Sequence, residues 1–342
     1  MLLDLLKISL TSKRSFRALR SVTMALSSTP GQREYVHNNA TERSANESLD
    51  LRSEKFGLSG WMWILSLIIA GIGLVGNIMV LWLLGFRIRR NPFSTYILNL
   101  AWADTLFLCL SFVSSLHEVM PFFNDATLFK GVAFVTYAFY TVGLSLLAVI
   151  STERCLSVLF PIWYRCHRPK LTSAAVCVVL WALIGLNCVA SSVICLYLCI
   201  NHLCNYFFIF EFTWFIFFTC VLCGSSLTLL LKVQCSSQRR QPPRLYLLIL
   251  LTVLVFLLCG LPMEIQDFIG HYKIRFMPLW LPWLLTSINS SANPFIYFFV
   301  GSKRHKIREP LRVVLQRAMG GEQELESGTR DTPHTNITET SF

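Results

Sequence analysis

The stretch from Trp61 to Leu84, WMWILSLIIAGIGLVGNIMVLWLL, contains no charged residue. A helix that crosses a bilayer needs about 20 mostly apolar residues, because hydrocarbon offers no water to exposed backbone groups. Comparable stretches follow at 93–116, 131–152, 171–231, 245–269 and 278–300. The stretch 171–231 is long enough for two crossings joined by a short turn at Asn201–Asn205. The sequence therefore predicts an all-α membrane protein, a bundle of seven transmembrane helices.

The composition supports this class of protein. Of the 342 residues, 54% are hydrophobic and 14% are charged, whereas soluble domains average about 25% charged residues. The formal net charge is +11. Nucleic-acid binding needs basic residues gathered on one solvated face, but here long apolar runs separate them. We therefore expect the lipid bilayer as a partner and exclude nucleic acid.

Basic residues lie mainly in the loops at one end of the expected bundle, while the loops at the other end contain only Lys130, Lys273 and Arg275. Lys and Arg close to span ends favour the cytoplasmic side. The C-terminus is thus expected in the cytoplasm and, because the number of spans is odd, the N-terminus outside. The residues at the basic end are Arg87, Arg89, Arg90, Arg165, Arg168, Lys170, Lys232, Arg239, Arg240, Arg244, Lys303, Arg304, Lys306 and Arg308.

The segment before the first span contains two glycosylation sequons. Asn39 and Asn46 each begin an Asn-X-Ser/Thr triplet, which agrees with an outer location. The charges near Met1 follow the apolar residues instead of preceding them, which is the reverse of a signal peptide. Met24 remains an alternative start.

Five short motifs occur in a fixed order along the expected spans. They are Gly76-Asn77, Leu100-Ala-Trp-Ala-Asp104, Trp181, Pro262 and Asn293-Pro-Phe-Ile-Tyr297. This order resembles that of the rhodopsin-like G-protein-coupled receptors. Two longer segments, Glu153–Pro169 and Asn289–Ser302, resemble the Mas-related receptors within that superfamily. The resemblance covers the spans and the short helix after them, and not the N-terminal tail.

The resemblance implies a multi-pass receptor of the plasma membrane, and not an enzyme. Its expected partners are an extracellular peptide or small cationic molecule, a heterotrimeric G protein of the Gq or Gi class, and arrestin. The alternative is a seven-span transporter, or a membrane protein without G-protein signalling. Transporters tend to show inverted repeats and spans broken at mid-membrane, and the sequence shows neither.

The chain is expected to have four parts. These are an extracellular N-terminal tail over 1–59, a seven-transmembrane receptor domain over 60–301, an amphipathic juxtamembrane helix over 302–318, and a disordered cytoplasmic tail over 319–342. The third part has apolar residues at helical spacing among basic ones, so we expect it along the inner leaflet.

Asp104 is the innermost carboxylate of the expected bundle, and a charge there is costly without a partner. Asn289 and Asn293 lie one helical turn apart on one face and, with Asn77, can join it in a polar cluster. The resemblance implies a pocket for a sodium ion that collapses on activation. Because Gly143 stands where relatives commonly have a serine, sodium stays an open alternative, as does a purely structural role.

The resemblance also implies an activation switch at the inner end of the bundle. Arg154 is expected to insert toward the G protein, with Glu153 holding it in the resting state as a charge-assisted pair. The foot of the sixth span, Arg239–Arg244, has no acid to add a second restraint. We therefore expect a weakly held resting state with appreciable basal activity.

Pro262 is expected to kink the sixth span, because proline removes a backbone hydrogen bond. By resemblance, Pro262 belongs to the switch together with Pro294 and Tyr297. Gly260 stands where many relatives have a tryptophan. The usual aromatic toggle is therefore missing, as it is in the Mas-related family.

Most of the twelve cysteines lie within the expected spans. Only Cys195, Cys199 and Cys204 lie near the outer surface. The resemblance implies a disulfide between spans four and five, which pairs Cys204 with Cys195 or with Cys199. The register favours Cys195.

Acidic residues in the outer halves of the spans are the candidates for ligand binding. Glu211 and Glu264 can face one another and attract a cationic ligand, with Asp267 close by. Alternatively, Glu264 and Asp267 are solvated rim charges. Trp214 is expected either in an aromatic cleft or at the lipid-facing or interfacial surface. Thr136 stands where amine receptors have an aspartate, which argues against a biogenic-amine receptor.

Some Mas-related receptors that bind cationic peptides carry an acid pair in spans four and five. This chain has Ser191 and Phe208 at those places. The ligand preference of those relatives therefore does not transfer to it.

Overall fold

The computed structural model describes residues 57–88, 92–120, 125–169, 171–235, 243–271, 274, 277–301 and 313–315. Within these ranges every regular element is a helix. The order is α3 (Leu58–Trp82), the π-helix η1 (Leu83–Arg87), α4 (Pro92–Val119), α5 (Ala126–Leu159), α6 (Pro161–Cys166), α7 (Thr172–Ser192), the π-helix η2 (Val193–Leu198), α8 (Asn201–Cys235), α9 (Pro243–Val255), the π-helix η3 (Phe256–Gly260), α10 (Leu261–His271) and α11 (Trp280–Gly301).

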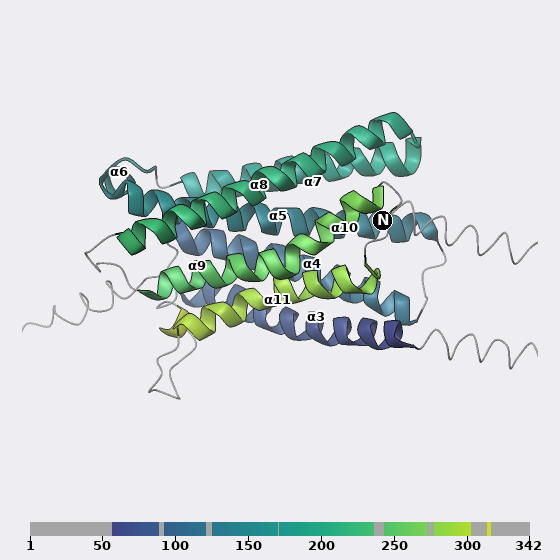
Figure 1. The fold of residues 1–342 in the computed structure, drawn as a ribbon, viewed down its shortest axis with the longest axis horizontal. Coiled ribbons are helices and arrows are strands. Elements are labelled where there is room, and N and C mark those ends of the chain that lie inside the picture. Colours follow the sequence, from purple (N-terminus) through teal and green to yellow (C-terminus); the bar gives the residue numbers. More distant parts are fainter. Residues whose placement is uncertain are drawn as a thin grey trace, which may run out of the picture.

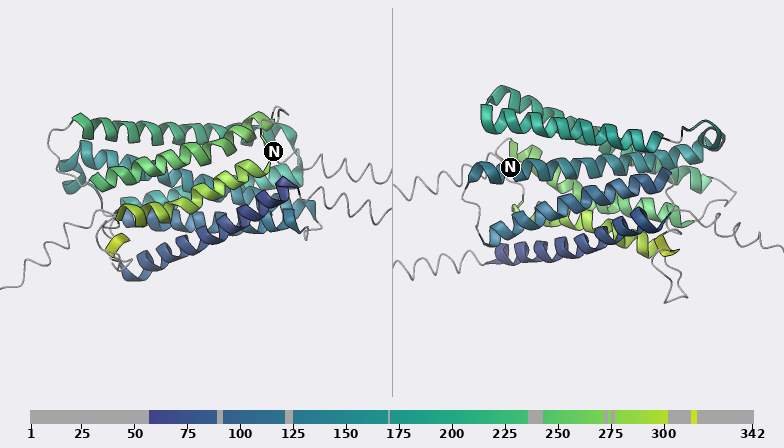
Figure 2. Two further views of the ribbon diagram at one scale, coloured as in Figure 1. Left: turned by 60° about the horizontal axis from the view of Figure 1, so that its bottom comes forward. Right: turned by 180° about the vertical axis from the view of Figure 1, so that it is seen from behind.

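The seven-span helix bundle is confirmed. Six helical segments of the described part are long and apolar enough to cross a membrane, namely Leu58–Arg87, Pro92–Val119, Thr127–Leu159, Thr172–Leu198, Asn201–Lys232 and Leu247–His271. The 22-residue helix α11, which contains Pro294, is the seventh span. The long helices run side by side, with α6 at one end of the bundle and the turn between α7 and α8 at the other (Figures 1 and 2).

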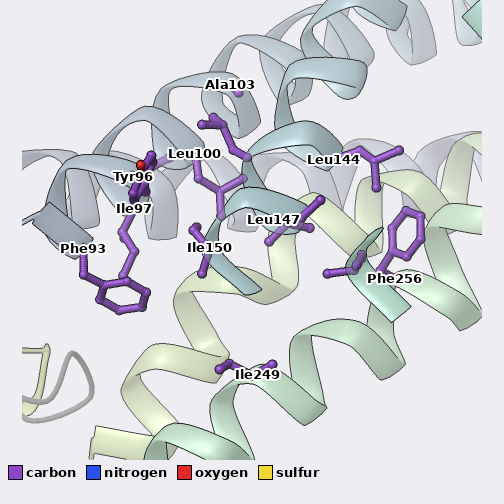
Figure 3. Close-up of a cluster of buried hydrophobic side chains, with 14 of the residues drawn as sticks. Phe93, Tyr96, Ile97, Leu100, Ala103, Leu144, Leu147, Ile150, Ile249 and Phe256 are labelled. Atoms are coloured by element: carbon purple, nitrogen blue, oxygen red, sulfur yellow. The ribbon is translucent and has the colours of Figure 1, made fainter. Parts of the chain in front are cut away.

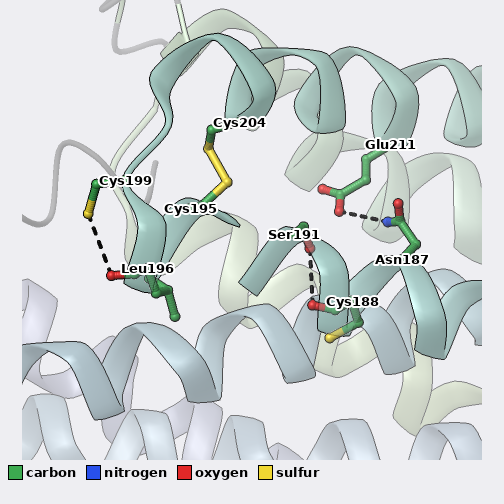
Figure 4. The surroundings of a disulfide bond; sticks show 8 residues. All are labelled: Asn187, Cys188, Ser191, Cys195, Leu196, Cys199, Cys204 and Glu211. Atoms are coloured by element: carbon green, nitrogen blue, oxygen red, sulfur yellow. Dashed lines mark hydrogen bonds between the residues drawn. A yellow bond between two sulfur atoms is a disulfide. The ribbon is translucent and has the colours of Figure 1, made fainter. Parts of the chain in front are cut away.

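The turn between spans four and five differs from the prediction. Residues Asn201–Asn205, expected to form it, are already the first turn of α8. The chain reverses instead at Cys199–Ile200, where Cys199 has a left-handed backbone with φ 52°. A disulfide joins Cys195 to Cys204 across this turn, with their Cα atoms 5.3 Å apart (Figure 4). Cys199 is free and exposed, so Cys195 is the partner of Cys204.

The sixth span changes its helical pattern just before Pro262. The α-helix α9 gives way to the π-helical turn η3 at Phe256–Gly260, and α10 then continues at an angle to α9 (Figure 1). A proline has no N–H for the carbonyl one turn earlier, and a wider turn accommodates that loss.

The main hydrophobic cluster joins α3, η1, α4, α5, α7, α8, α9, η3 and α11. Phe93, Ile97 and Leu100 of α4 meet Leu147 and Ile150 of α5 at its centre (Figure 3). The cluster also includes the fully buried Leu315, which lies beyond the last span. The predicted helix at 302–318 falls mostly outside the described residues, but Val313–Leu315 is helical and packs against the bundle.

Helices α3 and α11 approach closely at two glycines of α3. A Cβ on Gly73 would lie 2.7 Å from the Cβ of Ser291 and 2.9 Å from the Cδ1 of Leu108. A Cβ on Gly76 would lie 3.2 Å from the Cβ of Pro294. Small residues at such places let two backbones pack in lipid.

We expect Gly73→Ala to lower the stability of the purified receptor, because overpacking a close contact costs about 1–3 kcal/mol. The measurement is the apparent melting temperature in detergent. Gly71→Ala is the matched control, since a Cβ on Gly71 meets nothing within 4 Å. Equal melting temperatures for the two variants would contradict the packing of α3 on α11.

We expect Cys204→Ser and Cys195→Ser to lower the melting temperature and the amount of receptor at the cell surface to a similar degree. Loss of a short disulfide loop costs about 2–3 kcal/mol. Cys199→Ser is the control and should behave as wild type. A Cys199→Ser variant as unstable as Cys204→Ser would refute the pairing.

Candidate functional site

A cavity of about 300 Å³ lies between α7 and α8, with α5 as its floor. Most of the residues around it are apolar or aromatic, and none of those described is basic. Its polar side chains include Glu211, which accepts a hydrogen bond of 3.0 Å from Asn187 Nδ2 (Figure 4). Trp214 also lines the cavity, and its indole N–H donates to Ser145 Oγ at 3.2 Å. Two of the five expected ligand residues thus share one cavity.

Glu264 lies beside this cavity and not at a solvated rim. It is 2% exposed, and its Oε2 accepts a hydrogen bond of 2.9 Å from the hydroxyl of Tyr137, which itself lines the cavity. The expectation of a rim charge is therefore wrong for Glu264. Glu211 and Glu264 do not form a direct pair across the mouth, and Tyr137 stands between the cavity and Glu264.

Acidic side chains gather around Tyr137. Glu211, Glu264 and Asp267 all lie close enough to act on its hydroxyl electrostatically. Glu264 Oε1 and Asp267 Oδ1 are buried without a hydrogen-bond partner among the described residues. A carboxylate oxygen without a donor is costly in an apolar interior, so this end of the bundle favours a cation.

Thr136 does not line the cavity. It is 1% exposed, and its hydroxyl donates to the carbonyl of Val132 at 2.7 Å. The neighbouring Tyr137, which the sequence reasoning passed over, makes the contact with Glu264 instead. Asn187 was also missed, although a polar residue within a span was a signal that could have identified it.

The central polar cluster forms around Asp104. Asn293 Nδ2 donates to Asp104 Oδ2 at 2.8 Å, which joins α11 to α4. Asn77 Nδ2 donates to the carbonyls of Gly73 and Ser290, at 3.0 and 3.1 Å, which joins α3 to α11. Asn289 is also buried, at 7% exposed. The cluster therefore links three spans.

Gly143 supplies no hydroxyl to this cluster. A Cβ on Gly143 would lie 3.7 Å from Asp104 Oδ1, so a serine hydroxyl at this position could reach the carboxylate, and glycine supplies none. The side-chain amide nitrogens of Asn77 and Asn293 act as donors here, which leaves their Oδ1 atoms and the Asp104 carboxylate as the oxygens for an ion.

Glu153 does not restrain Arg154 as expected. Arg168 donates to both oxygens of Glu153, from Nε at 3.1 Å and from Nη2 at 3.0 Å, and the hydroxyl of Tyr96 adds a third hydrogen bond at 3.0 Å. A planar guanidinium matches a carboxylate in this forked geometry, and Arg168 makes this pair where the neighbouring arginine was expected. The Arg168 side chain is 5% exposed in this pair.

Arg154 lies instead over an aromatic ring. Its guanidinium carbon is 3.4 Å from the centroid of the Phe93 ring, a cation–π contact between α5 and α4. Its Nε and Nη2 are buried and have no hydrogen-bond partner among the described residues. No acidic side chain described here forms a hydrogen bond or an ion pair with Arg154, although the Glu153 carboxylate is near enough to act on it electrostatically.

The short helix α6 supports the ion pair at this end. The guanidinium of Arg168 lies 5.2 Å from the centroid of the Tyr164 ring. Burial and the nearby Glu153 carboxylate raise the pKa of Tyr164, so its phenol stays protonated at neutral pH. The sequence reasoning had counted Arg168 only as a basic loop residue.

Gly260 fits its position for a steric reason. A Cβ there would lie 2.7 Å from Phe256 Cδ2, and the hydroxyl of Tyr140 donates to the Gly260 carbonyl at 2.9 Å. The Phe256 ring thus lies against Gly260, the position at which many relatives have a tryptophan. Pro262 is the second residue of α10, and Tyr297 is buried beside a small cavity of about 20 Å³.

The sequons at Asn39 and Asn46 lie outside the described residues.

Comparison with known proteins agrees with this architecture. The family model of the seven-transmembrane receptors of the rhodopsin family matches residues 76–297. The Mas-related G-protein coupled receptor member X2 of Rhinopithecus bieti is 48% identical over 277 residues, which are 77% of this chain and 84% of that protein.

Two human proteins are similarly close. Member X2 is 48% identical over 278 residues, 75% of this chain and 82% of its own length. Member X1 is 46% identical over 287 residues, 79% of this chain and 86% of its own length. These matches do not favour a transporter. The chain belongs to the Mas-related G-protein-coupled receptors of the rhodopsin family.

Proposed function

We propose that this receptor converts the binding of an extracellular cationic ligand, a peptide or a small molecule, into activation of a heterotrimeric G protein of the Gq or Gi class. The N-terminus, with glycans on Asn39 and Asn46, lies outside the plasma membrane, and the C-terminus lies in the cytoplasm. The basic residues of one set of loops support this orientation. Phosphorylated Ser and Thr residues of the C-terminal tail dock arrestin.

The observation that carries the signalling proposal is the position of Arg154. The guanidinium stacks on Phe93, while Arg168 and Tyr96 occupy the carboxylate of Glu153. A cation–π contact contributes about 0.5–2 kcal/mol. Such a contact is a weaker restraint than a buried charge pair, so Arg154 can turn toward a G protein without first breaking an ion pair.

We expect measurable G-protein activation without agonist. Arg154→Ala should reduce this basal signal to background in calcium and cyclic-AMP assays at matched surface expression. Arg87→Ala is the control, because Arg87 is an exposed arginine at the same end of the bundle. A wild-type receptor without basal signalling, or a basal signal that Arg154→Ala leaves unchanged, would contradict the proposal.

The proposal of a cationic ligand rests on the acidic residues at the end of the bundle that carries the Cys195–Cys204 disulfide. Glu211 lines the large cavity, and Glu264 and Asp267 carry buried oxygens without donors among the described residues. A cation there would satisfy groups that the described protein leaves unpaired. Glu264 and Asp267 also lie on α10, the outer half of the span that must move.

For the central cluster, we propose a polar latch that works without a bound sodium ion. The Asp104–Asn293 hydrogen bond joins α4 to α11, and Asn77 ties α11 to α3. Breaking these contacts would free α11, which carries Pro294 and Tyr297.

We expect Asp104→Asn to change basal signalling at least twofold, because its neutral amide no longer gives Asn293 a carboxylate acceptor. The wild-type melting temperature should be the same in sodium chloride and in N-methylglucamine chloride. Gly143→Ser, which adds the missing hydroxyl, should gain a sodium-dependent stabilisation. A sodium effect in wild type that Asp104→Asn abolishes would contradict the sodium-free latch.

A further inference from the structure

The cavity beside Glu211 has lining residues on the lipid-facing surface of the bundle. Leu183 and Leu186 of α7 and Phe210 of α8 line it, and they are 49%, 70% and 49% exposed on the outside of the bundle. These residues lie within spans, so their exposed faces meet acyl chains. The mouth of the cavity is therefore in the bilayer.

Other elements border the cavity on its remaining sides. Helix α5 forms the floor with Phe134, Tyr137, Ala138 and Thr141. Above the cavity, the Cys195–Cys204 disulfide and the tight turn at Cys199–Ile200 join α7 to α8 (Figure 4). Glu211 lies seven residues beyond Cys204, about 10 Å further along the span at 1.5 Å per residue. A ligand can reach this depth most directly from the side.

The polar groups in the cavity suit an amine. Asn187 donates to Glu211 Oε1, which leaves Glu211 Oε2 and Asn187 Oδ1 as acceptors for a donor from a ligand. No Lys, Arg or His is among the described residues that line the cavity, and Glu264 and Asp267 place two further carboxyl groups behind Tyr137. An anionic or neutral headgroup would leave Glu211 without a counter-ion in lipid.

The remaining walls suit a hydrocarbon chain. Leu183, Ile184, Ala190, Phe207 and Phe210 surround the space between Glu211 and the lipid. A cavity of about 300 Å³ holds the head of an amphiphile and the first part of its chain. The rest of the chain can stay among the acyl chains.

We propose that this cavity is a binding site for a single-chain amphiphile with a protonated primary amine, which enters from the bilayer between α7 and α8. The amine binds Glu211 and Asn187, and the chain leaves past Leu186 and Phe210. The site deepens the cationic-ligand proposal above by naming the class of ligand and its route, and it rests on that proposal only for its effect on signalling.

The test uses the full-length receptor in phosphatidylcholine nanodiscs with dodecylamine as the probe. Dodecylamine should raise the melting temperature by several degrees, because a ligand that binds only the folded state stabilises it. Dodecanol, which lacks the charge, and butylamine, which lacks the chain, should have no effect at the same concentration. Equal shifts from dodecanol would overturn the amine site, and equal shifts from butylamine would overturn the route through the bilayer.

Two variants localise the binding. Glu211→Gln removes the charge and should weaken the apparent affinity about 10-fold or more. Ala190→Trp should fill the cavity and abolish the shift, whereas Val189→Trp, one residue away on the lipid-facing surface and outside the cavity lining, should leave it intact. A shift that Glu211→Gln and Ala190→Trp both preserve would overturn the site.

Because melting needs no G protein, the two proposals fail separately. No shift in wild type, together with a basal signal that depends on Arg154, would overturn the site and leave the receptor function standing. A site-specific shift in a receptor without basal or amine-stimulated signalling would support the site and contradict the proposed function.

Discussion

The hydrocarbon around this bundle offers no hydrogen-bond partner, so each polar side chain inside it must find one within the protein, on its own helix or on another. Asn293 donates to Asp104, Tyr137 donates to Glu264, and Trp181 donates to Asn99 at 3.1 Å. Each contact joins two spans that lie far apart in the sequence. Together these contacts set the register of helices whose apolar surfaces would otherwise slide past one another.

Apart from Thr219 Oγ1 in the middle of α8, the buried polar atoms without a partner among the described residues lie at the two ends of the bundle. At the disulfide end, Glu264 and Asp267 each carry a buried oxygen without a donor among the described residues. At the opposite end, Arg154 carries unpaired guanidinium nitrogens over Phe93. Native proteins tend to leave such groups where function needs them. In the proposed orientation, the acids face the ligand and Arg154 faces the G protein.

The sequence was sufficient for the seven spans, because charge-free stretches of about 20 residues have few alternatives. It also identified Glu211, Asp104 and Arg154, since a charge within a span stands out against its neighbours. The partners of these residues could not be predicted. Arg168 follows Arg154 by fourteen positions, and only the path of the chain through α6 brings it to Glu153.

The local geometry of the turn, of Tyr137 and of the cavity could not be predicted from the sequence either. The turn at Cys199 depends on a left-handed backbone that a cysteine seldom adopts. The polar residues from Asn201 onward therefore predicted the loop at the wrong place. Tyr137 reads as one aromatic among many until its hydroxyl is found at Glu264. The cavity arises because α7 and α8 each pack mainly on α5, which no linear pattern reveals.

The central claim is that Glu153 is held by Arg168 and leaves Arg154 free to act. Two double-mutant cycles on the melting stability of the agonist-free receptor test it most directly, pairing Glu153→Gln with Arg168→Gln and with Arg154→Gln. We predict a coupling of about 1–3 kcal/mol for Glu153 with Arg168 and less than about 0.5 kcal/mol for Glu153 with Arg154. A stronger coupling of Glu153 with Arg154 than with Arg168 would show that Glu153 restrains Arg154, and would contradict this claim.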